Sequence, residues 1–282
     1  MEKQKRVAAI HDISGFGKCS LTVALPIISA CGIETAVMPT AVLSTHTSGF
    51  TGYTFRDLTE DMLPFARHWK ENKIEFDAIY TGFLGSNEQI DIVAQIFDII
   101  SVDKTVKIVD PAMADNGNMY AIFNKEFARN MANLCKKADI IIPNFTEAAF
   151  MLGEEFVKPP YTVEYVEGLI KRLSKHCDAN IVLTGVSFDN ENLGAACYDK
   201  ETDKTEYAFS KWIEGAYHGT GDVFASVFTG VFVNGKTMLE ATEIAVNFTQ
   251  KCIVRTQAAD MSLRYGVDFE RGLWELGRDL LA

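Results

Sequence analysis

Short apolar runs rich in β-branched residues alternate with longer amphipathic stretches over nearly the whole chain. The runs predict strands at Val7–His11, Thr35–Leu43, Asp77–Thr81, Val106–Asp110, Asp139–Pro143 and Asn180–Thr184. The stretches predict helices at Cys19–Cys31, Met62–Asn72, Asn87–Ile100, Lys125–Lys137 and Val163–Lys175. Alternating strands and helices build a parallel sheet that is covered by helices. The pattern therefore predicts an α/β fold with a central, mainly parallel sheet and helices on both faces.

The pattern changes after Gly185. Residues 194–198 and 205–210 predict a hairpin, which fits an antiparallel edge on an otherwise parallel sheet. Three further helices are expected to close the chain. Hydrophobic residues make up 48% of the 282 residues, which is enough for a large core. Because there is no internal repeat or flexible linker, we expect residues 1–282 to form a single domain.

The net charge of −11 makes the chain a poor partner for nucleic acids and for anionic membranes. No apolar run approaches the roughly 20 residues that a membrane-spanning helix needs. Residues 1–6 lead directly into the first apolar run, without the longer apolar region of a signal peptide. We therefore expect a cytoplasmic protein with a small-molecule partner.

The segment Gly219-Thr220-Gly221-Asp222 stands directly before an apolar run that predicts a helix. Glycines allow a tight turn, and the free N–H groups at a helix start bind anions such as phosphate. A carboxylate in the first helical turn would lie beside that anion and could accept a proton from an attacking hydroxyl. The alternative is that Asp222 only complements the helix dipole.

Polar residues follow two predicted strands that end at the same sheet edge. Asp110 ends one strand with Asp115 five residues later, and Asn144 and Glu147 follow the next strand. Carboxylate and amide oxygens, completed by water and nucleotide phosphates, are typical ligands of Mg²⁺. The alternative is helix capping by Asn144 with Glu147 in the first turn.

Three further loops carry candidate ligand contacts. Thr184 and Gly185 end another strand, where a phosphate or ribose could be bound. The segment from Gly15 to Ser20 resembles a Walker A loop but lacks its pattern, because Asp12 replaces the first glycine and Cys19 replaces the hydroxyl residue. Asp12 and Ser14 face the strand-end crevice and could hydrogen-bond a substrate, and the alternative is that they form a turn before the helix. His46 and Thr47 lie in a dense polar loop after another apolar strand, which suggests ligand contact.

Taken together, these segments resemble the pyridoxal kinase branch of the ribokinase-like superfamily, from about Val7 to about Arg255. The matching segments are Ser44-Thr45-His46-Thr47, Thr81-Gly82-Phe83-Leu84-Gly85-Ser86, Asp110-Pro111 with Asp115, Met119-Tyr120, Asn144 with Glu147, and Gly219 to Asp222. The resemblance implies a ribokinase-like three-layer sandwich, ATP and Mg²⁺ as cofactors, stimulation by K⁺, a homodimer, and a B6 vitamer as substrate.

The resemblance also implies roles for individual residues. Gly219, Thr220 and Gly221 would form the anion hole, and Asp222 would activate the substrate hydroxymethyl. The remaining roles would be ATP binding by Asp110, Asn144, Glu147, Thr184 and Gly185, metal binding by Asp110, Asp115 and Glu147, and substrate binding by Asp12, Ser14, His46, Thr47, Phe83 and Tyr120.

Two departures from that family leave other substrates open. The first loop reads Asp12-Ile13-Ser14-Gly15, which looks like the hydroxymethylpyrimidine kinases of thiamine synthesis, and Phe83 stands where pyridoxal kinases often have Tyr. Hydroxymethylpyrimidine kinases tend to have Cys at the position of Asp222. The alternatives are therefore a hydroxymethylpyrimidine kinase, another ribokinase-like kinase, or a binding protein without catalysis.

Overall fold

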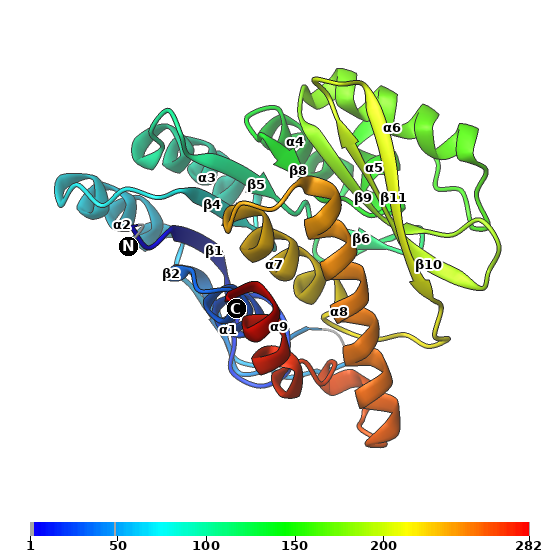
Figure 1. Ribbon diagram of the computed structural model, residues 1–282. Coiled ribbons are helices and arrows are strands. Elements are labelled where there is room, and N and C mark those ends of the chain that lie inside the picture. The colour runs from blue at the N-terminus through cyan, green and yellow to red at the C-terminus, as the bar shows by residue number, and fades with distance from the viewer. Residues whose placement is uncertain (1–2, 48, 282) are drawn as a thin grey trace.

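The computed structural model describes residues 3–47 and 49–281, and within them nine strands form one sheet (Figure 1). The strand order is β11-β10-β9-β8-β5-β4-β1-β2-β3. The strands are β1 (Arg6–Ser14), β2 (Glu34–Leu43), β3 (Phe55–Asp57), β4 (Ala78–Thr81), β5 (Val106–Val109), β8 (Ile140–Ile141), β9 (Asn180–Val186), β10 (Asn192–Asp199) and β11 (Lys204–Lys211). The pairs from β2 to β9 are parallel, and β10, β11 and β3 are antiparallel to their neighbours.

Helices cover both faces of this sheet (Figure 1). One buried cluster joins the sheet to α2 (Thr59–Glu71), α3 (Asn87–Ile100), α4 (Lys125–Cys135), α5 (Phe145–Leu152) and α6 (Val163–Cys177). The other joins it to α1 (Leu21–Ala30), α7 (Thr220–Val233), α8 (Met238–Ala258) and α9 (Leu273–Leu281). The predicted three-layer α/β fold with an antiparallel edge hairpin is confirmed.

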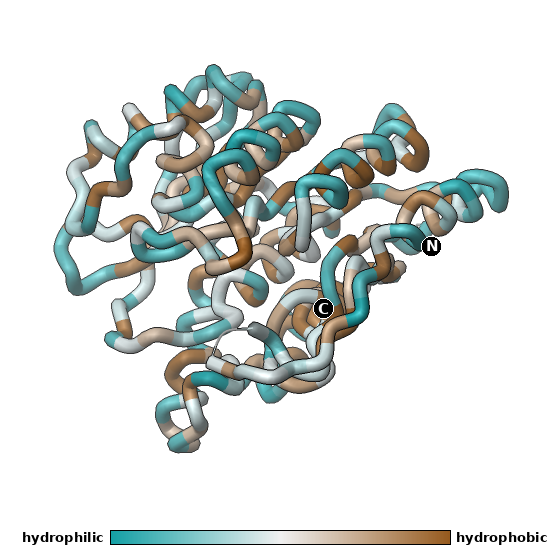
Figure 2. The backbone as a smooth tube through the Cα atoms, turned by 180° about the vertical axis from the view of Figure 1, so that it is seen from behind, coloured by the Kyte–Doolittle hydropathy of each residue, from teal (hydrophilic) through white to brown (hydrophobic). Residues whose placement is uncertain are grey.

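The flanking helices show why the sequence adopts these layers. In Figure 2 hydrophilic and hydrophobic residues alternate along the outer helices, as expected for elements with one exposed and one buried side. Side-chain caps fix several helix starts: Ser86 accepts a hydrogen bond from the Gln89 N–H, and Thr162 accepts one from the Tyr165 N–H. None of the helices in the described ranges is long and apolar enough to cross a membrane.

The register brings the strand ends to a common edge. In the parallel pairs Thr81 lies beside both Ile10 and Val109, and Ile141 lies beside both Val109 and Ile181. The segments that follow β1, β4, β5, β8 and β9 therefore leave the sheet side by side. This is the edge at which ligands bind in open α/β sheets.

Several local predictions are corrected. β1 continues to Ser14 rather than ending at His11, with a register shift between His11 and Ile13, so Asp12 and Ser14 are strand residues. α1 begins at Leu21 rather than Cys19. The edge strand β3 and the short hairpin of β6 (Ala114–Asp115) and β7 (Asn118–Met119) have no counterpart in the sequence prediction, and α5 is indicated there only by the capping alternative at Asn144.

Candidate functional site

A cavity of about 550 Å³ opens at the carboxyl ends of the parallel strands. Every site residue predicted from the sequence lies on its wall: Asp12, Ser14, His46, Thr47, Phe83, Asp110, Asp115, Tyr120, Asn144, Glu147, Thr184, Gly185, Gly219, Thr220, Gly221 and Asp222. They come from segments spread over more than 200 positions of the sequence. The common edge of the parallel strands brings them together.

The turn before α7 has the geometry of an anion site. Gly219 has a φ of 77°, and a Cβ there would overlap the carbonyl oxygen of Lys18, so only glycine fits. A Cβ at Gly221 would meet no atom within 4 Å. The first N–H groups of a helix have no acceptor inside the helix. The start of α7 therefore presents donors and a positive dipole end to the cavity, which fits a phosphate group.

Asp222 lies in the first turn of α7, half-buried at the cavity wall. Burial raises the pKa of its carboxyl from 3.8 to about 7, and the nearby Asp12 carboxylate acts in the same direction. A hydrogen bond from the Ser20 N–H opposes this shift by stabilising the charged form. A carboxylate whose pKa lies near neutral pH is suited to accept a proton from a substrate hydroxyl.

Asp110 and Glu147 form a buried acidic pair across the cavity floor. Burial, then repulsion from Glu147 and Asp222, raises the pKa of Asp110 well above its ordinary value. Burial raises the pKa of Glu147 to about 8 against the opposing effect of backbone hydrogen bonds. Within the described ranges neither carboxylate has a Lys or Arg ion-pair partner. Such a pair favours a bound cation.

Asn144 and Glu147 also cap a helix, which is the alternative role that the sequence offers for them. The Asn144 side chain accepts from the Glu147 N–H at 3.0 Å, and the Glu147 carboxylate accepts from the Asn144 N–H at 2.9 Å, which forms a capping box at α5. The second Glu147 oxygen accepts from the Met113 N–H at 3.1 Å. These bonds hold the carboxylate beside Asp110 and leave lone pairs for a further ligand.

The acidic residues fit a metal only in part. Asp115 is exposed, and its carboxylate accepts hydrogen bonds from the backbone and side chain of Asn116 at 2.8 and 2.9 Å. In the described part of the chain no three His, Cys, Asp or Glu residues form a group that could hold a metal ion by itself. Mg²⁺ commonly takes one or two carboxylates and completes its shell with phosphates and water. Asp110 and Glu147 fit that donor set, and Asp115 is the weaker candidate.

The opposite part of the cavity wall carries the predicted substrate residues. Asp12 and Ser14 are buried, and the Ser14 hydroxyl donates to the Asp12 carboxylate at 3.3 Å. The buried His46 ring is bonded through Nε2 to the Arg264 carbonyl oxygen at 2.7 Å, and its ring centroid lies 5.7 Å from that of His218. This fixes the imidazole at the wall.

Aromatic side chains close the same region. The Phe83 ring centroid lies 5.5 Å from that of Phe123, which in turn lies 6.3 Å from that of Tyr120. Thr47 is exposed at the cavity mouth. An aromatic wall beside polar groups is suited to a flat, heteroaromatic small molecule.

Sequence reasoning missed the rest of the lining. Near Thr184 the rings of Phe145 and Tyr161 stack with centroids 3.7 Å apart. Another part of the wall comes from the loop after β11 and from α8, through Trp212, Ile213, Val246, Thr249, Gln250 and Ile253. Most of these residues are indistinguishable from core residues in a sequence. The pair Trp212-Ile213 in a loop was the one available signal.

Comparisons with known proteins agree with this geometry. The model of the family described as "Phosphomethylpyrimidine kinase" matches residues 25–266. A solved protein from Bacteroides thetaiotaomicron, assigned as a phosphomethylpyrimidine kinase, is 35% identical, with a TM-score of 0.92 and coverage of 98% of this chain and 94% of that chain. Pyridoxal kinase from Lactobacillus plantarum is 27% identical, with a TM-score of 0.89 and coverage of 97% of each chain.

Curated relatives are more distant. The hydroxymethylpyrimidine/phosphomethylpyrimidine kinase of Bacillus subtilis is 25% identical over 220 residues, which are 77% of each protein. The chain spans 42% of the length of a bifunctional thiamine biosynthetic enzyme of Arabidopsis thaliana, with 24% identity over 229 residues. The family match covers most of the chain and includes the anion site and the acidic pair. The chain therefore belongs to the phosphomethylpyrimidine kinase family.

Proposed function

We propose that this kinase transfers the γ-phosphoryl group of ATP to the 5′-hydroxymethyl group of pyridoxal, pyridoxine or pyridoxamine. The observation that carries the proposal is the position of Asp222. This carboxylate, with a pKa raised to about 7, stands on the first turn of a helix whose free N–H groups face the same cavity. A base and a phosphate site are thus adjacent.

The residues divide the work of phosphoryl transfer. Asp222 takes the proton of the hydroxymethyl group as its oxygen attacks phosphorus. The N–H groups at Gly219, Thr220 and Gly221 stabilise the charge that develops on the transferred phosphoryl oxygens. Asp110 and Glu147 would hold Mg²⁺, which neutralises phosphate charge when it is bound.

The choice of a B6 vitamer is supported by two relatives. The Bacteroides thetaiotaomicron protein was also solved in a form with pyridoxal, at 35% identity to this chain, and the Lactobacillus plantarum relative is a pyridoxal kinase. Asp222 itself agrees with this choice, since hydroxymethylpyrimidine kinases tend to carry Cys there. Thr184 and Gly185 would contact the nucleotide at the far end of the cavity.

A second candidate is phosphorylation of hydroxymethylpyrimidine. It is favoured by the Asp12-Ile13-Ser14-Gly15 segment and by the Bacillus subtilis relative. Both substrates carry a hydroxymethyl group on a flat heteroaromatic ring, so the same base and anion site would serve either. The two differ in the ring contacts made near Asp12, Thr47 and Phe83.

The experiment is a product assay with purified protein, ATP and Mg²⁺. Each B6 vitamer, hydroxymethylpyrimidine and a sugar are offered separately, and phosphorylated products are identified by mass spectrometry. Asp222→Ala is expected to lower turnover by about 100-fold or more with little change in ATP affinity. Near-normal turnover in that variant would remove Asp222 from the mechanism.

The family resemblance also supports stimulation by K⁺ and a homodimer, and we include both in the proposal. Titration of K⁺ at constant ionic strength tests the first. Light scattering during size-exclusion chromatography tests the second, and a monomer at assay concentration would contradict it.

A further inference from the structure

The short segment after α8, residues 264–266, lies behind the substrate wall of the cavity, and we call it the strap. The carbonyl oxygen of Arg264 accepts a hydrogen bond from Nε2 of His46 at 2.7 Å. Because a carbonyl oxygen can only accept, Nε2 of this imidazole carries a proton. The next carbonyl oxygen, that of Tyr265, accepts from the Lys18 N–H at 3.1 Å. Two consecutive peptide groups thus bind the loop after β2 and the segment before α1.

The side chains of the strap pack on aromatic rings beside His46. The guanidinium carbon of Arg264 lies 4.7 Å from the centroid of the Phe50 ring and 5.4 Å from that of the Tyr265 ring. The Phe50 ring meets the His46 ring edge-on, with centroids 4.9 Å apart. The Tyr265 ring meets the Phe16 ring in the same way at 5.2 Å. Arg264 therefore bonds the imidazole through its backbone and supports the neighbouring ring through its side chain.

Lys18 is in close contact with both the strap and the anion site. Gly266 has a φ of 91°, and a Cβ there would lie 2.6 Å from the Cβ of Lys18. A Cβ at Gly219 would overlap the Lys18 carbonyl oxygen. Each backbone approaches Lys18 too closely for a side chain, so only glycine fits at either position. The strap is thus packed, through one residue, against the turn that would bind phosphate.

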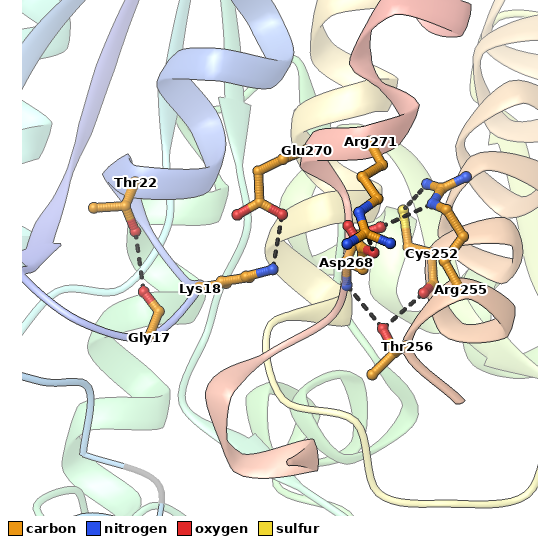
Figure 3. Close-up of polar contacts among 9 residues, drawn as sticks. All are labelled: Gly17, Lys18, Thr22, Cys252, Arg255, Thr256, Asp268, Glu270 and Arg271. Carbon is orange, nitrogen blue, oxygen red and sulfur yellow. Dashed lines mark hydrogen bonds and ion pairs between the residues drawn. The ribbon is translucent and has the colours of Figure 1, made fainter. Parts of the chain in front are cut away.

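The chain directly after the strap is fixed to α8 and to Lys18 (Figure 3). The Asp268 N–H donates to the Thr256 hydroxyl at 2.8 Å, and the Asp268 carbonyl oxygen accepts from Nε of Arg255 at 3.0 Å. Lys18 Nζ lies 2.7 Å from the Glu270 carboxylate. Asp268 is only 3% exposed, so its backbone bonds are shielded from water. These bonds fix the strap at its far end.

We propose that Arg264 is a positioning residue for the alcohol substrate: the strap fixes the ring of His46 at the substrate wall and sets its place relative to the anion site. Of the described residues, Arg264 is not among those that line the cavity, so it acts through His46. The inference rests on the proposed function and deepens it. It names what orients the alcohol toward the transferred phosphoryl group, a reaction that depends on placement.

The first test is steady-state kinetics with the alcohol that the wild type phosphorylates. Arg264→Ala should raise the KM for the alcohol about fivefold or more, because one hydrogen bond typically contributes about two- to tenfold to an equilibrium constant. The KM for ATP should stay within about twofold, since the proposed nucleotide contacts come from β9. Arg264→Lys keeps a cation beside the rings and should lose less. Arg278→Ala is the matched control, an exposed arginine 4.9 Å from the Trp274 ring centroid in α9, and should leave both KM values unchanged.

Two further comparisons separate positioning from a general structural role. In a His46→Ala background, Arg264→Ala should raise the alcohol KM no further, since it acts through that ring. Gly266→Ala displaces the strap and should raise the alcohol KM about tenfold or more. Gly235→Ala carries similar backbone strain, with a φ of 105°, in the turn between α7 and α8, and it should leave the alcohol KM unchanged.

An alcohol KM for Arg264→Ala within about twofold of wild type would overturn the proposal, as would an equal rise in the His46→Ala background. Equal rises in the KM values for alcohol and ATP would also overturn it. If the wild type phosphorylates hydroxymethylpyrimidine and no vitamer, the proposed function falls, and the same kinetics with that alcohol decide on Arg264. If it phosphorylates no alcohol, urea unfolding of Arg264→Ala, Phe50→Ala and the double variant decides. Non-additive midpoints would support the hold of the strap on the loop, and additive midpoints would refute it.

Discussion

Replacing Asp222 by Asn should make the protein more stable at alkaline pH while it abolishes the proposed catalysis. Burial raises the pKa of Asp222 from 3.8 to about 7. Between these values the folded protein holds a proton that the unfolded chain has released. The contribution of Asp222 to stability is thus fully present below about pH 4 and is lost as pH rises through 7. Asn cannot ionise and avoids this loss.

The size of the effect follows from the two pKa values. Each unit of difference corresponds to about 1.36 kcal/mol. The quantity to compare is the free energy of unfolding of Asp222→Asn minus that of the wild type. Between pH 5 and pH 8 this difference should grow by about 2.5 kcal/mol in favour of the variant. This is an upper figure, because the half-buried carboxylate reaches solvent in the cavity. Most of the growth in this stability difference should occur below pH 7, and above pH 7 the difference should be nearly constant.

The assay is urea unfolding of both proteins at unit steps from pH 5 to pH 8, without nucleotide or metal. Asp61→Asn, which removes an exposed carboxylate from the first turn of α2, controls for the loss of one negative charge. A difference between Asp222→Asn and wild type that does not grow with pH would refute the burial argument. So would a wild type that is the more stable protein at pH 8.

Three further predictions concern the same site. The rate kcat/KM should rise with pH around 7, because Asp222 must be ionised to accept a proton; a pH–rate profile from 5.5 to 9 checks this, and a flat profile contradicts it. Gly219→Ala should destabilise the protein by about 1–3 kcal/mol in urea unfolding, because its φ of 77° and the Lys18 carbonyl oxygen exclude a Cβ. Asp110→Asn should raise the Mg²⁺ concentration for half-maximal turnover by about tenfold or more, measured by metal titration, and an unchanged requirement would exclude Asp110 as a ligand.

The architecture could be predicted because its signal is periodic. Strand runs and amphipathic helices repeat over most of the chain, and parallel strands place their carboxyl ends together. This alone places Asp110, Asn144, Thr184 and the residues at the end of β1 at one edge of the sheet. The turn at Gly219 was predictable because two glycines directly before an apolar helix are typical of an anion-binding turn.

The remainder depends on contacts between distant segments. The apolar run predicts a strand that ends at His11, yet pairing with β2 and a register shift extend β1 through Asp12 and Ser14. Ser20, directly before α1, has a φ of 51°, which the sequence does not indicate because a serine before a helix usually has extended backbone angles. The apolar walls at Phe145 and Trp212 resemble core residues, because cavities and cores use the same side chains.

The most direct test is to incubate the wild type and Asp222→Ala with ATP, Mg²⁺ and each candidate alcohol, and to identify products by mass spectrometry. The proposed function predicts the 5′-phosphate of at least one B6 vitamer with the wild type and about 100-fold less with the variant. A wild type that phosphorylates none of the vitamers, or a variant with equal turnover, would contradict it.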